Sequence, residues 1–124
     1  MCGENQVSRQ NWIDWAECAW WDDIRETDTL NVSEGRGEDD TKHICPLQLE
    51  VIRRLVKLYS DPGEIVFSPF TGIGSEGYIA LSLWRKFYGC ELKDEYHRAA
   101  MKNLKRAVDN RKKEEEQVLF KVGA

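Results

Sequence analysis

The sequence has 124 residues, of which 41% are hydrophobic and 32% are charged, and its formal net charge is −4. A chain of this length holds one domain at most, and its apolar content is ordinary for a soluble globular protein, which argues against general disorder. The negative charge disfavours a protein whose main task is to cover a nucleic-acid backbone, because such domains carry a basic excess.

The cysteines and the N-terminus bear on metal binding and location. The four cysteines form no CxxC pair and lie far apart, so we expect free thiols and no metal site. They are Cys2, Cys18, Cys45 and Cys90. No apolar run approaches the roughly 20 residues that cross a bilayer, and the start of the chain lacks the pattern of a signal peptide. We therefore expect a cytoplasmic protein with no membrane partner.

The N-terminal 32 residues concentrate four of the five tryptophans, Trp12, Trp15, Trp20 and Trp21. Such side chains bury a large area only against a partner surface, so we expect residues 1–32 to pack on the following domain, a second chain or a ligand. Residues 33–41 read SEGRGEDDT, which has two glycines and no large apolar residue and therefore predicts a mobile loop.

The segment after Pro46 carries an amphipathic helical pattern, since apolar residues recur at three- and four-residue spacing. These residues are Leu47, Leu49, Val51, Ile52, Leu55, Val56 and Leu58. The sequence Asp61-Pro62-Gly63 ends the helix, because proline and glycine cannot extend its last turn.

Residues 64–67 then form a β-branched and aromatic run that is typical of a buried strand. The turn Gly72-Ile73-Gly74 follows, and Ser75 is placed to cap a helix over residues 75–84. A second strand is predicted over residues 86–90.

A long helix is predicted from Lys93 or Asp94 onward. We take residues 42–110 as the folded unit and residues 111–124 as a charged helix end or tail, because the run RKKEEEQ can extend a helix through charge pairs or fray into solvent. The order of strand, helix, strand and helix predicts an α/β fold with a right-handed crossover and a short parallel sheet flanked by helices.

The glycine turn is the first feature that indicates chemistry. A glycine turn between a strand and a helix lets backbone N–H groups approach a ligand, and Gly72 and Gly74 have no Cβ to block it. Glu91 ends the second strand, where a carboxylate can accept hydrogen bonds from the hydroxyls of a ribose. Gly77 completes the letters GxGxxG, so spacing alone also allows a nicotinamide dinucleotide.

Three stretches carry a resemblance: HICPLQLEVIRRLVKLY, DPGEIVFSPFTGIGSEGYIAL and RKFYGCEL, within residues 43–91. They resemble the C-terminal half of the bacterial and phage DNA amino-methyltransferases, which modify adenine N6 or cytosine N4. In that family a histidine and a proline precede a helix, followed by a PGD-like turn, a DPFxGxGTT-like loop and a (K/R)FxGxE strand. The resemblance implies a partial Rossmann-like methyltransferase fold, as found in enzymes of restriction–modification systems.

The resemblance also implies S-adenosylmethionine as cofactor and a set of residues that hold it. The loop around the methionine and adenosine parts corresponds to Ser68, Pro69, Phe70, Thr71, Gly72, Gly74 and Ser75. Glu91 corresponds to the ribose-binding carboxylate, with Leu92 beside it. His43, Ile44 and Pro46 match a motif that lines the methionine side, and Thr27–Asn31 resembles a segment that often precedes that motif.

The sequence departs from the family pattern at two places in the loop. Ser68 stands where aspartate is common, which removes a negative charge that can attract the amino group and sulfonium of the cofactor. Ser75 and Glu76 replace the common Thr-Thr pair. A carboxylate in the first turn is favoured by the helix dipole but discourages an anionic ligand.

The family's catalytic motif, (Asp/Asn/Ser)-Pro-Pro-aromatic, does not occur, since Pro46, Pro62 and Pro69 are all isolated. In the subclass that the chain resembles, that motif lies upstream of the cofactor loop. We therefore expect no catalytic residue here and interpret the chain as the cofactor-binding portion of a methyltransferase, truncated or half of a split enzyme and inactive alone. The alternative is a non-catalytic methyltransferase-like interaction protein of phage or prophage origin.

Partners follow from this interpretation. A catalytic-half chain or a second copy is expected, because a short parallel sheet leaves edges that attract pairing. DNA is expected to be reached through a partner or the assembled enzyme, in a bacterial cell or a phage-infected host. A basic stripe at helical spacing is interpreted as a solvated helix face; it comprises Arg98, Lys102, Lys105 and Arg106.

Overall fold

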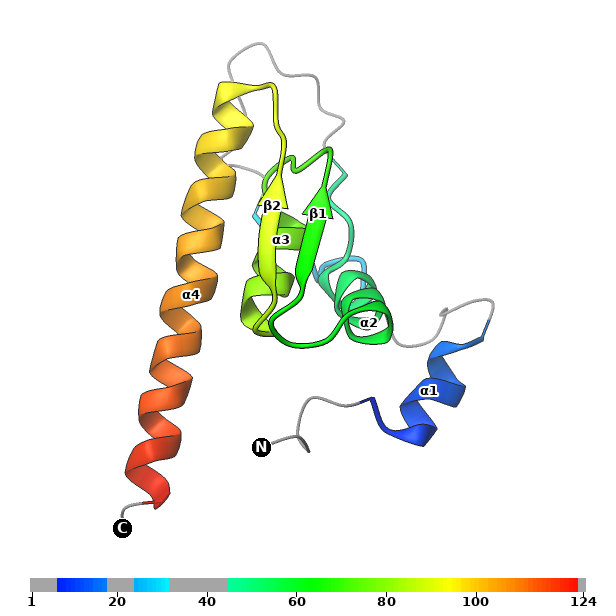
Figure 1. Cartoon of the computed structure of the whole chain (residues 1–124). Coiled ribbons are helices and arrows are strands. Elements are labelled where there is room, and N and C mark those ends of the chain that lie inside the picture. Colours follow the sequence, from blue (N-terminus) through cyan, green and yellow to red (C-terminus); the bar gives the residue numbers. More distant parts are fainter. Residues whose placement is uncertain (1–6, 18–23, 32–44, 123–124) are drawn as a thin grey trace.

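The computed structural model of the protein describes residues 7–17, 24–31 and 45–122. The elements are α1 (Arg9–Trp15), α2 (Leu49–Tyr59), β1 (Ile65–Ser68), α3 (Ser75–Ser82), β2 (Lys86–Gly89) and α4 (Asp94–Val122) (Figure 1). The predicted loop at residues 33–41 lies outside the described residues.

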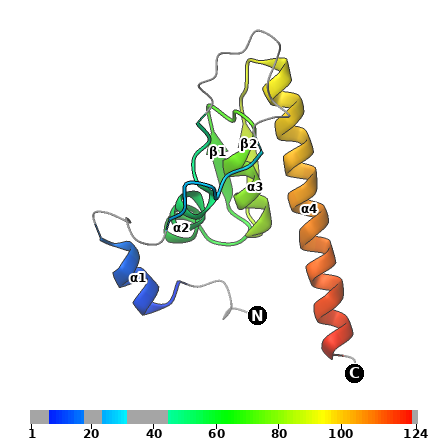
Figure 2. The ribbon, with the colours of Figure 1, turned by 180° about the vertical axis from the view of Figure 1, so that it is seen from behind.

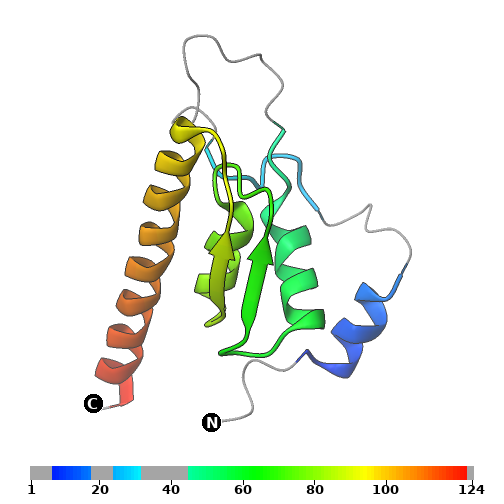
Figure 3. The same ribbon diagram turned by 45° about the horizontal axis from the view of Figure 1, so that its top comes forward.

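A βαβ unit forms the centre of the fold. Strands β1 and β2 pair in parallel, from Ile65 opposite Lys86 to Ser68 opposite Gly89. Seen from the α3 side, β2 lies to the right of β1, so the crossover is right-handed (Figure 2). In every view α4 runs along the β2 side and α2 lies on the β1 side (Figure 3). The predicted class is confirmed: the fold is α/β, with a short parallel sheet flanked by helices.

Two boundaries of α3 differ from the prediction because of left-handed backbone. Gly74, with φ of 87°, is the residue at the N-cap, and no side chain caps the helix; the prediction that Ser75 is the cap was wrong, since Ser75 is already the first helical residue. The helix ends at Ser82 instead of residue 84. Trp84 has φ of 67°, a conformation that no helix continues through.

The apolar core lies between the helices and one face of the sheet. Ile52 and Val56 of α2 pack against Ile79 and Leu83 of α3. This arrangement follows from the amphipathic pattern of α2, which puts its apolar residues on one stripe. A second cluster joins residues far apart in the sequence: Leu30, Ile73 and Ala99.

Arg85, the residue before β2, is buried although it is charged. Its guanidinium donates to Leu83 O at 2.7 Å, to Ser60 Oγ at 3.2 Å and to Ser60 O. Burial lowers the pKa of Arg85, while the nearby carboxylates of Asp61 and Glu64 raise it. These hydrogen bonds fasten the end of α2 to the start of β2, and so fix where the second strand begins.

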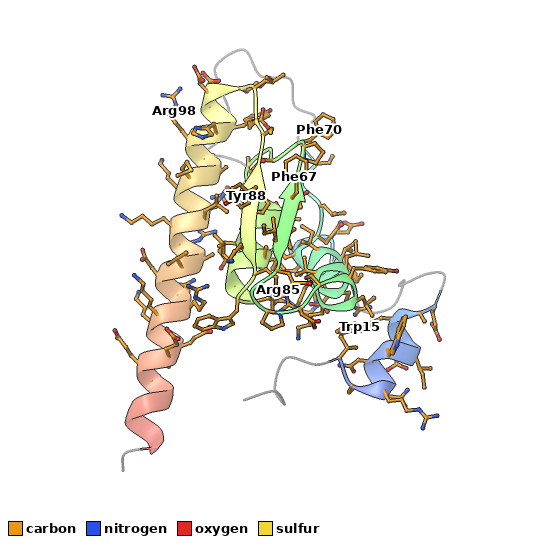
Figure 4. The ribbon with its side chains drawn as sticks, in the orientation of Figure 1. Trp15, Phe67, Phe70, Arg85, Tyr88 and Arg98 are labelled. Atoms are coloured by element: carbon orange, nitrogen blue, oxygen red, sulfur yellow. The ribbon has the colours of Figure 1, made fainter. Side chains whose placement is uncertain are left out.

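The second face of the sheet is open. Ile65, Phe67 and Tyr88 are 59%, 61% and 62% exposed on it, and Figure 4 labels Phe67 and Tyr88 there. Glu64 O and Ser68 O accept hydrogen bonds from Lys86 N and Cys90 N. The alternating backbone groups of Ile65 and Phe67 therefore point to the other edge of β1. Parallel sheets are normally covered on both faces.

The tryptophan-rich segment touches the unit through Trp15. The guanidinium carbon of Arg54 lies 5.5 Å from the centroid of that ring, while Trp12 is exposed. Trp20 and Trp21 lie outside the described residues. In the described part of the chain, no helix combines the length and the apolar character that a membrane span requires.

Candidate functional site

The loop from Ser68 to Ser75 lies at the carboxyl ends of the two strands, where open α/β sheets bind ligands (Figure 1). The backbone of Cys90, the residue after β2, holds the first part of the loop. Cys90 N donates to Ser68 O at 3.0 Å, and Thr71 N donates to Cys90 O at 2.9 Å. These two hydrogen bonds therefore fix the backbone of the loop where it leaves β1.

The two glycines of the loop have left-handed backbone, with φ of 54° at Gly72 and 87° at Gly74. A Cβ on Gly74 would lie 3.1 Å from Ala100 Cα, so a side chain there would push α4 away. At Gly72, by contrast, a Cβ would meet no atom within 4 Å among the described residues. The backbone at Gly72 thus faces open space that a ligand can occupy.

Glu91 meets this loop from the end of β2. Its Oε2 accepts from Gly72 N at 2.8 Å, and its Oε1 accepts from Leu92 N and Lys93 N at 2.9 Å each. An ionised carboxylate offers about four lone-pair sites, so acceptor capacity remains beside these bonds. The structure brings together the loop and the carboxylate that the sequence singled out.

Three polar side chains of the loop region are buried: Ser68, Thr71 and Ser75. Thr71 is 7% exposed, and its Oγ1 has no hydrogen-bond partner among the described residues. This hydroxyl lies against Gly89, where a Cβ would overlap it. Phe70, on the other hand, is exposed at this end of the sheet (Figure 4). Leu92, which follows Glu91, is also exposed.

Of the predicted residues His43, Ile44 and Pro46, the structure describes only Pro46. His43 and Ile44 lie outside the described residues, and Pro46 is half-buried in the segment that leads into α2. The assignment of Pro46 to a cofactor pocket stays a prediction.

The Thr27–Asn31 segment has a clearer structural role, which sequence reasoning missed. Asp28 O accepts from Leu49 N at 2.7 Å, and Asp28 Oδ2 accepts from Glu50 N at 3.0 Å. These bonds cap the start of α2 from 22 residues away, beyond the reach of a local capping signal. Leu30 packs on Ile73 of the glycine loop.

Two cavities lie away from the glycine loop. A polar one of ≈ 490 Å³ at the start of α2 has two arginines and two carboxylates, which balance in charge; it is lined by Arg25, Thr27, Asp28, Glu50 and Arg54. The other is an apolar groove of ≈ 520 Å³ between α2 and β1, which includes Leu55, Ile65 and Glu76. Glu76 therefore faces this groove.

Burial raises the pKa of the Glu76 carboxyl above its ordinary value of 4.5, and a backbone hydrogen bond opposes the rise. A raised folded-state pKa gives stability that is complete below the unfolded pKa and is lost as pH rises through the folded pKa. The Glu76→Gln variant, which stays neutral, should therefore gain unfolding free energy relative to the parent chain as pH rises above the ordinary carboxyl pKa of 4.5. Urea denaturation at several pH values measures this, with the exposed-carboxylate variant Glu115→Gln as control. A relative gain that shrinks with rising pH would contradict the assignment.

No metal centre is formed by the described residues, because no three His, Cys, Asp or Glu side chains gather there. Cys45 and Cys90 are exposed free thiols. Cys2 and Cys18 lie outside the described ranges.

Comparison with known proteins relates the chain to one family. The family model described as DNA methylase, of the N6 and N4 type, matches residues 4–102. Type II methyltransferase M.BglI of Bacillus subtilis is 31% identical over 110 residues, which cover 89% of this chain and 28% of that protein. The DNA adenine methyltransferase YhdJ of Escherichia coli (strain K12) is 35% identical over 54 residues, 44% of this chain and 18% of that protein.

A shorter, stronger match is to Type II methyltransferase M.BglII of Bacillus subtilis, 39% identical over 59 residues, 48% of this chain and 16% of that protein. The crystal structure of the M1.HpyAVI–SAM complex aligns with a TM-score of 0.48 and 33% identity, covering 56% of this chain and 34% of that one. The chain thus spans between 16% and 28% of the length of these curated relatives.

Proposed function

This chain belongs to the N6 and N4 family of DNA methylases, and from that membership we propose that it is the S-adenosylmethionine-binding portion of a DNA (adenine-N6 or cytosine-N4) methyltransferase. The single observation that carries the proposal is the hydrogen bond from Gly72 N to the Glu91 carboxylate at 2.8 Å. It places the glycine loop and the carboxylate of Glu91 side by side at the carboxyl ends of the two strands, where both can contact one ligand.

The shape of the glycine loop is compatible with S-adenosylmethionine. Open space in front of Gly72 lets a ligand approach the backbone, because no described atom lies where its Cβ would point. Exposed Phe70 and Leu92 supply apolar surface for a planar base.

Glu91 fits a ribose. Its carboxylate is held by backbone N–H groups on both oxygens, so it cannot swing away when a ligand arrives. Remaining lone pairs can accept the hydrogen bonds of the two ribose hydroxyls. When bound, S-adenosylmethionine supplies an electrophilic methyl group, and the residues of this chain would hold and orient it.

Transfer of that methyl group depends on residues outside this sequence. No Pro-Pro-aromatic tetrapeptide occurs in it, so the side chains that hold a target amino group would come from another part of the enzyme, in the same or a second polypeptide. DNA would be bound by the assembled enzyme. The proposal extends to a bacterial or phage restriction–modification setting, which the names of the Type II relatives support.

The open sheet face supports a polypeptide partner. Ile65, Phe67 and Tyr88 are exposed on a parallel sheet, whose faces are normally both covered by helices. The curated relatives are several times longer than the matched region, so they have additional chain to cover such a face. A catalytic part that docks there would also carry the missing motif to the carboxyl ends of the strands.

Calorimetric titration of the purified chain tests the cofactor assignment, with S-adenosylmethionine, S-adenosylhomocysteine and NAD as ligands. Both sulfur nucleosides should bind with Kd below about 1 mM, equivalent to about −4 kcal/mol, and NAD should bind more weakly. Heat of dilution alone for both sulfur nucleosides, with a chain shown to be folded by circular dichroism, would refute the proposal. Tighter binding of NAD would favour a dinucleotide site instead.

A further inference from the structure

Asn103, in the middle of α4, reaches the glycine loop although it is 30 residues from it in sequence. Its Nδ2 donates to Ile73 O at 2.8 Å, and the side chain is buried, with the residue 8% exposed. We propose that Asn103 is a positioning residue, which fixes the backbone of the glycine loop in the conformation that binds the cofactor. The proposal rests on the proposed function in that it takes the loop as the nucleoside site.

The hydrogen bond acts on one peptide group in particular. Ile73 O and Gly74 N belong to the same peptide unit, and Gly74 N donates to Thr71 O at 2.8 Å. Asn103 therefore holds the carbonyl end of this unit while Thr71 holds its amide end. Because glycine permits both signs of φ, a peptide that precedes glycine can flip easily unless both ends are bound.

The two sides of the loop are held by different elements. Contacts from Cys90 and Glu91, which directly follow β2, fix Thr71 and Gly72. The contact from α4 fixes the next peptide unit, after Ile73. Loss of the α4 contact would therefore leave the Glu91 side in place and disturb the second half of the loop selectively.

The packing of α4 makes Asn103 a rigid support. Ala99, Ala100 and Ala107 are buried, at the spacing of one helix face that also includes Asn103. Their small side chains let the helix axis approach the loop closely, as shown by the 3.1 Å that would separate a Gly74 Cβ from Ala100 Cα. A short side chain such as asparagine can then reach the carbonyl of Ile73 directly.

The test replaces Asn103 by leucine, which has a similar volume and no donor, in the full chain. Asn110→Leu is the matched control, because Asn110 is exposed on the same helix. We expect the Kd for S-adenosylmethionine to rise about 5- to 30-fold in Asn103→Leu and to stay unchanged in Asn110→Leu. A buried carbonyl left without a donor accounts for that effect.

A spectroscopic readout separates positioning from general stability. In glycine-selective ¹⁵N-labelled protein, the amide signal of Gly74 should shift or broaden in Asn103→Leu, while those of Gly72, which Glu91 holds, and of Gly63, in a distant turn, should not. Asn103→Ala removes the donor without adding bulk or charge, so it should give the same signature even if the leucine variant does not fold. Unchanged Gly74 signals in a folded variant, or unchanged affinity, would overturn the proposal.

The outcomes also distinguish this inference from the proposed function. If the parent chain does not bind S-adenosylmethionine, the proposed function fails, but the Gly74 signal still reports whether Asn103 positions the loop. If the parent binds and both Asn103 variants bind equally well, the positioning role fails and the proposed function stands.

Discussion

Replacement of Gly77 by valine is expected to lower the free energy of unfolding of the βαβ unit substantially. Gly77 lies in α3 where that helix contacts both β2 and α4, and its missing side chain makes room for them. A Cβ there would overlap Leu104 Cδ2 and lie 2.7 Å from two ring carbons of Phe87. Overpacking of this kind costs about 1–3 kcal/mol or more, against a total stability of roughly 5–15 kcal/mol. Far-UV circular dichroism and urea denaturation measure the loss.

The alanine variant and a double variant make this prediction specific. Gly77→Ala should lose less than the valine variant, since alanine favours helix by about 1 kcal/mol over glycine. Leu104→Ala removes the atom nearest to the new Cβ. The loss of unfolding free energy in the double variant Gly77→Ala/Leu104→Ala should therefore be smaller than the sum of the two single losses. Strict additivity, or a Gly77→Val chain as stable as the parent, would show that the helices relax around the new side chain.

Replacement of Glu91 by alanine is expected to weaken S-adenosylmethionine binding by roughly 1.5–3 kcal/mol, or about 10- to 150-fold in Kd. Two effects combine, because the carboxylate both accepts from the ribose under the proposed function and anchors Gly72 N at 2.8 Å. Glu91→Gln keeps one acceptor oxygen and should retain part of the affinity. Titration calorimetry at one pH and salt concentration compares the variants.

The matched control for Glu91 is Glu95→Ala, four residues further on. Glu95 is an exposed carboxylate in the first turn of α4 and pairs with Arg98 at 3.5 Å, so its removal changes the net charge equally without touching the loop. Affinity in this variant should match that of the parent chain. Equal affinity of Glu91→Ala and the parent would place the ligand site elsewhere.

The order of elements in the folded unit was predictable because each element carries its own pattern. The stripe of α2 and the apolar run of β1 are local properties, and Gly72 and Gly74 mark the turn between β1 and α3. The exact start and end of α3 were not predictable, since they depend on left-handed backbone at Gly74 and at Trp84. Trp84 is not a residue type that suggests such a conformation.

The glycine loop and Glu91 could be predicted from the sequence. The residues that hold the surrounding backbone in place could not. Glu91 and Gly72 were paired by a family pattern, and the structure brings them within hydrogen-bond distance. Asn103 and Asp28 had no local signal, because each acts across 20 residues or more on a backbone group that only the folded chain brings close. Long-range polar contacts of this kind depend on packing, which a single sequence does not display.

Concentrated solutions of the chain alone are expected to be colloidally unstable because of the open sheet face. Exposed Phe67 and Tyr88 lie beside an unpaired strand edge, which is a template for edge-to-edge aggregation. Charge repulsion opposes that process and vanishes near the pI of ≈ 5.2. Precipitation should thus be most severe in mildly acidic buffer, where the apolar face persists and the molecules no longer repel one another.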